Sequence, residues 1–304
     1  MAHWSGGEDA ALFTLDEERV GILTVDFITP VVDDPYQWGR IAAANSLSDV
    51  FAMGGRPLCA LNLVCFPLNC QPLSVLKAVM EGGAQAVRES GAFLAGGHSI
   101  EDKEPKYGLC VYGEGSQSSL WRTTGGKAGD VVVLTKKIGT GPVATALKAD
   151  MVSPSALQDA TESMALLNTL PRFMSPSLHQ SITSCTDITG FGLAGHLLDM
   201  ASDQKIDIHI DWSHVPLIEG AKDYAEMGLL PVGAFRNKER YLHLVHGQER
   251  ENDFLYDPQT SGGLAFTLPE EQVQELVDLA HQHQVPVAII GHVEPGTGKL
   301  HVHP

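Results

Sequence analysis

The chain has 304 residues and a mass of 32.6 kDa, with 43% hydrophobic and 19% charged residues. This composition excludes a disordered or low-complexity chain, and the length predicts two domains because single cores rarely exceed roughly 250–300 residues. The formal net charge of −17 disfavours nucleic acid as a partner, because phosphate backbones are bound by clustered Lys and Arg.

No targeting or membrane segment is expected at the N-terminus. The opening MAHWSGGEDAAL has no basic stretch followed by an apolar run, and no window approaches the roughly 18 apolar residues of a membrane span. We therefore expect a cytoplasmic protein that does not bind a membrane. The cysteines form no Cys-x-x-Cys pair and no zinc-finger spacing, so we interpret all five as reduced thiols: Cys59, Cys65, Cys70, Cys110 and Cys185.

The first part of the chain alternates strands with helices. Apolar runs typical of short strands occupy residues 20–27, 56–67 and 106–115. Stretches of helical length span residues 35–53 and 72–90. The first of these helices has Asp34 as N-cap, Pro35 in its first turn and Gly54 as terminator. The polar, glycine-rich residues 116–130 then indicate a domain boundary.

The second half mixes the same two kinds of element. Strand-like runs begin at residue 130 and recur at residues 262–269 and 286–293. Helical stretches lie near residues 142–150, 154–170, within 185–203 and at 270–283. Both halves therefore predict α/β or α+β layers, with domains over residues 1–117 and 118–304.

The stretch NSLSDVFAMGG (45–55) places polar residues inside a helix with apolar neighbours. Asn45, Ser48 and Asp49 share one helix face, because positions three and four apart are neighbours. A solvated helix face explains the stripe as well as a functional site does, and the helix alone leaves both interpretations open.

Further aspartates lie where sites of layered α/β folds gather. Asp26 ends an apolar strand, Asp9 follows a Gly-Gly pair, and Asp187 precedes a helix. Together with Asp49 they suggest ligands for Mg²⁺, which takes carboxylate oxygens together with substrate phosphates. For each aspartate alone, a capping or turn role remains the alternative.

Two glycine motifs imitate a dinucleotide fingerprint. GFGLAG (190–195) has Asp211 about 20 residues on, but the preceding QSITSCTDIT is too polar for a central parallel strand. GTGPVA (139–144) contains a proline and lacks the acidic partner. Both patterns therefore disfavour a nicotinamide or flavin cofactor.

Other short motifs carry weaker signals. AGGHS (95–99) is either a glycine-rich turn that offers N–H groups to a phosphate or an ordinary tight turn, and His98 is a candidate general base. His301 and His303 are expected to lie on an exposed strand and to ligate nothing.

The assembled motifs resemble the selenophosphate synthetases, also called selenide, water dikinases. The matching blocks run in family order over nearly the whole chain: DFITPVVDDPYQWGRIAAANSLSDVFAMGG, LAGGHSI, LTKKIGTG, TDITGFGLAGH and DPQTSGG. The resemblance implies the two-domain ATP-binding fold of the aminoimidazole ribonucleotide synthetase superfamily. It also implies a homodimer formed through the N-terminal sheet, with ATP bound in a cleft between the domains.

The implied reaction converts ATP, selenide and water to selenophosphate, AMP and phosphate. By motif position the resemblance makes Mg²⁺ ligands of Asp9, Asp49 and Asp187. It places Asp26 beside the nucleotide and metals, has Asn45 support the metal site, and has Gly97, His98 and Ser99 contact ATP. Potassium is a further cofactor expected of the family. A triphosphate near several carboxylates requires bridging cations, which explains a retained Asp49.

The chain departs from the family pattern ahead of Asp9. The family carries there a glycine-rich loop with a Cys or selenocysteine and a Lys, and the segment from Met1 has neither. We therefore assign no catalytic residue and expect Mg–ATP binding and dimerisation with little or no selenophosphate formed. The alternatives are a non-catalytic nucleotide-binding homologue and another small-molecule kinase or synthetase of the superfamily.

Overall fold

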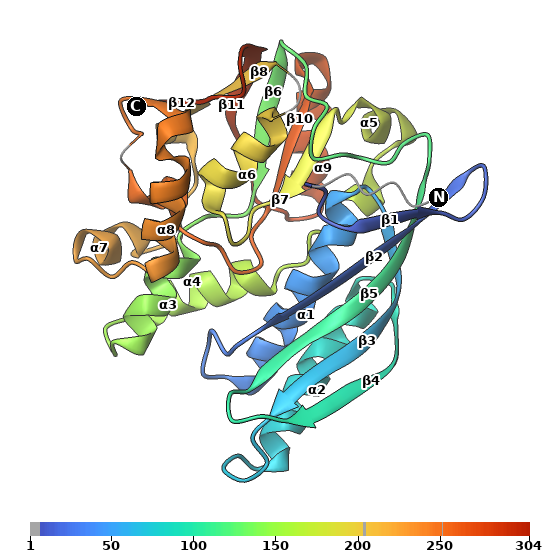
Figure 1. Cartoon of the computed structure of the whole chain (residues 1–304), viewed down its shortest axis with the longest axis vertical. Helices are drawn as coiled ribbons and strands as arrows, with labels where there is room; N and C mark the ends of the chain where they lie inside the picture. Colours follow the sequence, from blue (N-terminus) through green and yellow to red (C-terminus); the bar gives the residue numbers. More distant parts are fainter. Residues whose placement is uncertain (1–6, 203–204, 251) are drawn as a thin grey trace. The chain divides into compact units, whose positions relative to one another are not determined.

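The computed structural model describes residues 7–202, 205–250 and 252–304, which belong to two compact units. Unit 1 comprises the chain up to Leu120 together with Met164–Thr169. Unit 2 comprises Trp121–Ser163 and Leu170–Pro304. Figure 1 labels their helices and strands along the chain. Among the described residues, no helix is both long enough and apolar enough to cross a membrane.

Unit 1 is a sheet with helices on one of its faces. Its strands follow the order β1-β2-β5-β3-β4, and only β3 and β4 pair in parallel. The strand bounds are β1 (Ala11–Thr14), β2 (Arg19–Ile28), β3 (Arg56–Phe66), β4 (Phe93–Glu101) and β5 (Lys106–Ser116). Helices α1 (Pro35–Ala52) and α2 (Leu73–Glu89) cross between parallel strands in the same direction, so both cover the same face (Figure 1).

Helix α1 forms as its terminal residues predict. The Asp34 side chain accepts a hydrogen bond from Gln37 N at 3.0 Å, Pro35 begins the helix, and Gly54 follows its end with φ +67°. Helix α2 packs closely on α1, because a Cβ at Gly39 would lie 1.9 Å from the Val79 carbonyl oxygen. The glycine therefore sets the separation of the two helices.

Unit 2 contains a sheet with the order β7-β10-β6-β11-β8-β12-β9. Its strands are β6 (Asp130–Thr135), β7 (Ser184–Asp187), β8 (Ile206–Asp211), β9 (Val245–Gly247), β10 (Leu264–Pro269), β11 (Val287–Pro295) and β12 (Leu300–His303). Neighbouring strands are antiparallel except at β12, which runs parallel to both β8 and β9. The strand predicted at His301 and His303 therefore exists and lies between β8 and β9, with His303 exposed and His301 half-buried.

Helices pack against this sheet and around it. Their bounds are α3 (Thr140–Lys148), α4 (Pro154–Ala165), α5 (Pro176–Ser181), α6 (Gly192–Ala201), α7 (Ala221–Glu226), α8 (Val232–Tyr241) and α9 (Glu270–Gln282). Short 3-10 helices span Leu170–Phe173, Trp212–His214, Leu242–Leu244 and Asp253–Tyr256. Helix α6 contacts β7, β8 and β12, whereas α9 contacts β6, β10 and β11. Strand β10 is buried along almost its whole length, but β8 buries only alternate residues.

Candidate functional site

The contact between β2 and α1 holds two carboxylates together with their hydrogen-bond donors. Asn45 Nδ2 donates to Asp26 Oδ2 at 2.5 Å, and the Thr24 hydroxyl donates to Asp49 Oδ2. Thr24 and Asp26 lie two apart on one face of β2, while Asn45 and Asp49 are one helical turn apart. Strand and helix therefore bring Asp26 and Asp49, which the sequence analysis singled out separately, to one place in unit 1.

The polar stripe of α1 is not a solvated helix face. Asn45 is only 5% exposed, Ser48 is fully buried, and Asp49 is half-buried. Ser48 Oγ accepts a hydrogen bond at 2.8 Å from Asn168 Nδ2, which belongs to the second chain segment of unit 1. The interpretation of the stripe as a solvated surface is therefore wrong.

The carboxyl group of Asp26 is partly buried. Burial raises the pKa of Asp26, and the hydrogen bond from Asn45 opposes that rise. Ser46 secures the backbone there, because its Oγ donates to Asp26 O at 2.9 Å and accepts from Leu109 N at 3.1 Å. Sequence reasoning missed Thr24 and Ser46, since their partners are distant in the chain.

Asp9 lies just before the edge strand β1. In the antiparallel register Ala11 pairs with Leu23, and Asp9 lies in a bend two residues ahead of that pair. Asp9 is half-buried. The expectation about the family's Cys or selenocysteine and Lys concerns the segment ahead of Asp9, where residues 1–6 lie outside the described residues.

Gly97, His98 and Ser99 lie within strand β4, so the expectation of a turn is wrong. The segment is extended because it pairs in parallel with β3, with a register shift next to Asn62. All three residues are exposed. A Cβ at Gly97 would lie 2.3 Å from the Asn62 carbonyl oxygen, which requires glycine there. His98 points to the opposite face of the strand from its two neighbours.

In unit 2, Asp187 ends β7 close to a buried lysine. Lys136 follows β6, and its Nζ donates to Ser261 O at 2.8 Å. Burial lowers the pKa of Lys136 to about 7, while the negative charge of Asp187 opposes this shift. The lysine lies within the motif LTKKIGTG, but nothing in its local pattern distinguishes it from the neighbouring Lys137.

Side chains of the motif DPQTSGG cap the N-terminus of α3. Gln259 Oε1 accepts hydrogen bonds from Gly139 N at 2.9 Å and from Thr140 N at 3.1 Å. Asp257 Oδ2 accepts from Gly141 N at 3.2 Å and from Gln259 Nε2 at 2.7 Å. The helix N-terminus in GTGPVA is thus satisfied by side chains of the protein itself.

The other glycine motif lacks the setting of a dinucleotide site. GFGLAG does open α6, but the preceding β7 pairs antiparallel with β10 at the edge of the sheet. A dinucleotide fingerprint needs a parallel strand in that position. His196 instead fixes this loop, because its Nε2 accepts from Thr189 N at 3.1 Å, and burial lowers the pKa of His196 to about 4.

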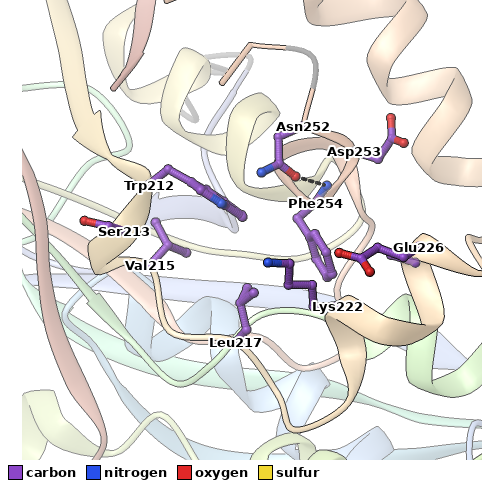
Figure 2. A pocket seen from close by; sticks show the side chains of 10 residues that line it. Trp212, Ser213, Val215, Leu217, Lys222, Glu226, Asn252, Asp253 and Phe254 are labelled. Atoms are coloured by element: carbon purple, nitrogen blue, oxygen red, sulfur yellow. Dashed lines mark hydrogen bonds between the residues drawn. The ribbon is translucent and has the colours of Figure 1, made fainter. Parts of the chain in front are cut away.

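A separate cavity of about 460 Å³ lies in unit 2 (Figure 2). It is lined by Trp212, Ser213, Val215, Leu217, Lys222, Ala225, Glu226, Asn252, Asp253 and Phe254. The hydrogen bond drawn in Figure 2 runs from Phe254 N to Asn252 Oδ1 at 3.2 Å and caps a 3-10 helix, so it is a structural contact. The residues predicted for nucleotide and metal lie elsewhere.

Comparison with known proteins identifies the group of proteins that share this fold. Residues 7–114 match the N-terminal domain, and residues 127–303 the C-terminal domain, of the AIR synthase related proteins. A solved structure of the hydrogenase maturation protein HypE in complex with ATP has a TM-score of 0.74 at 17% identity, covering 97% of this chain and 84% of that one. The two-domain fold of this chain is therefore that of the AIR synthase related proteins.

Curated relatives show to which family of AIR synthase related proteins the chain belongs. The selenide, water dikinase of Clostridioides difficile (strain 630) is 45% identical over 294 residues, covering 95% of this chain and 83% of the relative. That of Clostridium botulinum (strain Alaska E43 / Type E3) is 43% identical over 290 residues, with 94% and 83% covered. The chain belongs to the selenide, water dikinase family, as its motifs predicted.

Proposed function

We propose that the function of this site is ATP-dependent synthesis of selenophosphate from selenide and water, with release of AMP and phosphate. The expectation that this sequence forms little or no product stays a prediction. The proposal rests on family membership and on the paired carboxylates Asp26 and Asp49 between β2 and α1. ATP is supported further by HypE, which has the same fold and whose structure was solved in complex with ATP.

We assign Mg²⁺ binding in unit 1 to Asp9 and Asp49, and in unit 2 to Asp187. The donor set suits this ion, because carboxylate oxygens are the ligands that hard divalent cations prefer. The raised pKa of Asp26 supports the assignment, since a nearby cation would stabilise the ionised form that burial disfavours. Asn45 then acts as a positioning residue that holds the Asp26 carboxylate.

We assign nucleotide contacts to Asp26 and to the β4 segment Gly97, His98 and Ser99. The segment is exposed, and its glycine leaves backbone accessible. Because successive strand residues face opposite sides, Gly97 and Ser99 share a face that His98 does not. Potassium follows from the family resemblance alone.

We further propose a homodimer through the open face of the unit 1 sheet. Large apolar side chains on that face are strongly exposed, with Val25 at 60%, Phe27 at 54% and Phe93 at 63%. Leu23, Tyr112 and Cys59 align across three strands of this face, and so do Val25, Cys110 and Leu61. Apolar patches of this kind mark protein interfaces. We accordingly propose that residues 1–117 form the domain that mediates dimerisation and binds metal.

The test is the product of the reaction. The chain is incubated with Mg²⁺, ATP and selenide, and nucleotides are separated by ion-exchange chromatography. AMP that forms only when selenide is present supports the proposal. Formation of ADP alone would favour a simple kinase, and Mg²⁺-dependent ATP binding without turnover would favour the non-catalytic homologue.

A further inference from the structure

Four histidines form a row across four strands of the unit 2 sheet. His292 on β11 pairs with His209 on β8, His209 pairs with His301 on β12, and His301 pairs with His246 on β9. Residues that pair in this way point to the same face of a sheet. The rings of His209 and His301 stack at 4.3 Å between centroids with 4° between planes, and His292 stacks on His209 at 5.2 Å.

At one end of this histidine row the ligand atoms converge. Glu294 Oε1 lies 3.1 Å from His292 Nε2, and Glu294 Oε2 lies 3.6 Å from His209 Nε2. The ligand atoms of these three residues all lie within 4.8 Å of one another. A tetrahedral ion with bonds near 2.0–2.1 Å separates its ligands by about 3.4 Å. The two nitrogen–oxygen distances, one to each oxygen of Glu294, lie on either side of that value.

A second set of contacts orients the central ring. His209 Nδ1 lies 3.1 Å from His303 Nε2. A metal on His209 Nε2 requires the proton on Nδ1, which then donates to His303. On the far side of His209, His301 Nε2 contacts Asp207 Oδ2 at 3.1 Å, and Asp207 Oδ1 accepts from Lys299 N at 2.9 Å.

The competing interpretation is an ion pair between protonated His209 and Glu294. His209 Nε2 faces Glu294, whereas Nδ1 of the same ring contacts His303 Nε2. The ring therefore offers one nitrogen to a metal and keeps the other for a hydrogen bond, which is the arrangement typical of metal-bound histidine. The face is accessible, because His292 and Glu294 are exposed while Ile208 and Ile210 are buried on the other side of β8.

We propose that His209, His292 and Glu294 bind a divalent transition-metal ion of the imidazole-preferring class, with Zn²⁺ as the representative ion and His303 as the positioning residue. Two imidazoles and one carboxylate leave a fourth position to water or to another ligand. The set differs in chemistry from the oxygen ligands assigned to Mg²⁺, so the two kinds of ion do not compete for the same residues.

The experiment is a titration of the full chain with Zn²⁺ by calorimetry, and with Co²⁺ by visible absorption, both in excess Mg²⁺. We expect one ion per chain and the absorption of a tetrahedral Co²⁺ complex. His209→Ala and His292→Ala should each weaken Zn²⁺ binding by at least about 100-fold, and His303→Ala by about 10-fold. His281→Ala removes an exposed histidine of α9 and is the matched control.

A loss of Zn²⁺ binding in these variants can be distinguished from misfolding. Circular dichroism melts in a chelator should match among the variants, and Glu294→Gln, which keeps the size of the side chain, tests the site without removing a ring. The proposal is overturned if the parent chain binds no Zn²⁺. It is equally overturned if His209→Ala, His292→Ala and Glu294→Gln bind Zn²⁺ as tightly as His281→Ala does.

Discussion

Asn45 donates a hydrogen bond to Asp26 from the third turn of α1 to the later part of β2. The donor is a neutral amide, so the bond orients the carboxylate without neutralising it. Burial raises the pKa of Asp26 at the same time. The contact between β2 and α1 thus holds a partly desolvated acidic group, and the divalent cation proposed above would offset the unfavourable desolvation.

Asp49→Asn should weaken Mg²⁺-dependent ATP binding by at least about tenfold, because a metal-bridged contact to the phosphates loses its charge. Stability should change by less than about 1 kcal/mol, since the amide oxygen still accepts the Thr24 hydroxyl. Calorimetry with and without Mg²⁺ measures the loss, and Asp33→Asn, an exposed aspartate before α1, is the control. Equal affinity in the two variants would remove Asp49 from the site.

Asp257 should make unit 2 less stable as the pH rises from about 4 to about 7. Burial raises the pKa of Asp257 from 3.8 to about 7, against hydrogen bonds from Gln259 and Gly141. The folded state then binds the proton more tightly than the unfolded chain, so the free energy of unfolding falls through this window, by up to about 4 kcal/mol.

Urea unfolding at several pH values within that window tests the claim. Asp257→Asn should flatten the decline, whereas Asp278→Asn, on the exposed side of α9, should leave it as in the parent chain. A decline of the same steepness in both variants would assign the pH dependence to other groups.

Gly263→Ala should destabilise the protein by about 1–3 kcal/mol or more, because the new Cβ would lie 1.7 Å from the Thr135 carbonyl oxygen, which is backbone. Gly190→Ala is the matched control, since no atom lies within 4 Å of its Cβ position. Both variants are compared by urea denaturation. Similar stabilities would mean that the β6–β10 contact tolerates a shift.

Val25→Asp should convert the proposed dimer to monomers, because it places a charge in the apolar face of the unit 1 sheet. Sedimentation velocity at several concentrations measures the change. Val232→Asp, which alters an equally exposed valine on α8, should leave the dimer intact. A monomeric parent chain, or a Val25→Asp dimer of unchanged affinity, would contradict the proposed interface.

Local signals predicted most of the elements. The helix over residues 35–53 was found because Asp34, Pro35 and Gly54 act within a few residues of the helix ends. Residues 95–99 were instead predicted as a glycine-rich turn, although they lie within strand β4. Its extended form depends on pairing with β3, which lies more than 30 residues earlier and is not visible in a local window.

The same limit explains what was missed in the site. The aspartates could be selected singly, because they stand at strand ends and helix starts. Thr24 and Gln259 could not, since their partners Asp49 and Thr140 are 25 and 119 residues away. The histidine row was likewise invisible, because it exists only through the register of four strands.

The placement of β12 between β8 and β9 also constrains how unit 2 is built. Among the described strands, β9 is joined to the sheet only by β12, which is synthesised well after it. During synthesis on the ribosome, β9 therefore has no strand to pair with until β12 has emerged. Until then, the backbone N–H and C=O groups of β9 remain available for pairing with other strands. The edge formed by β9 is thus expected to be the last part of unit 2 to acquire protection from hydrogen exchange during synthesis.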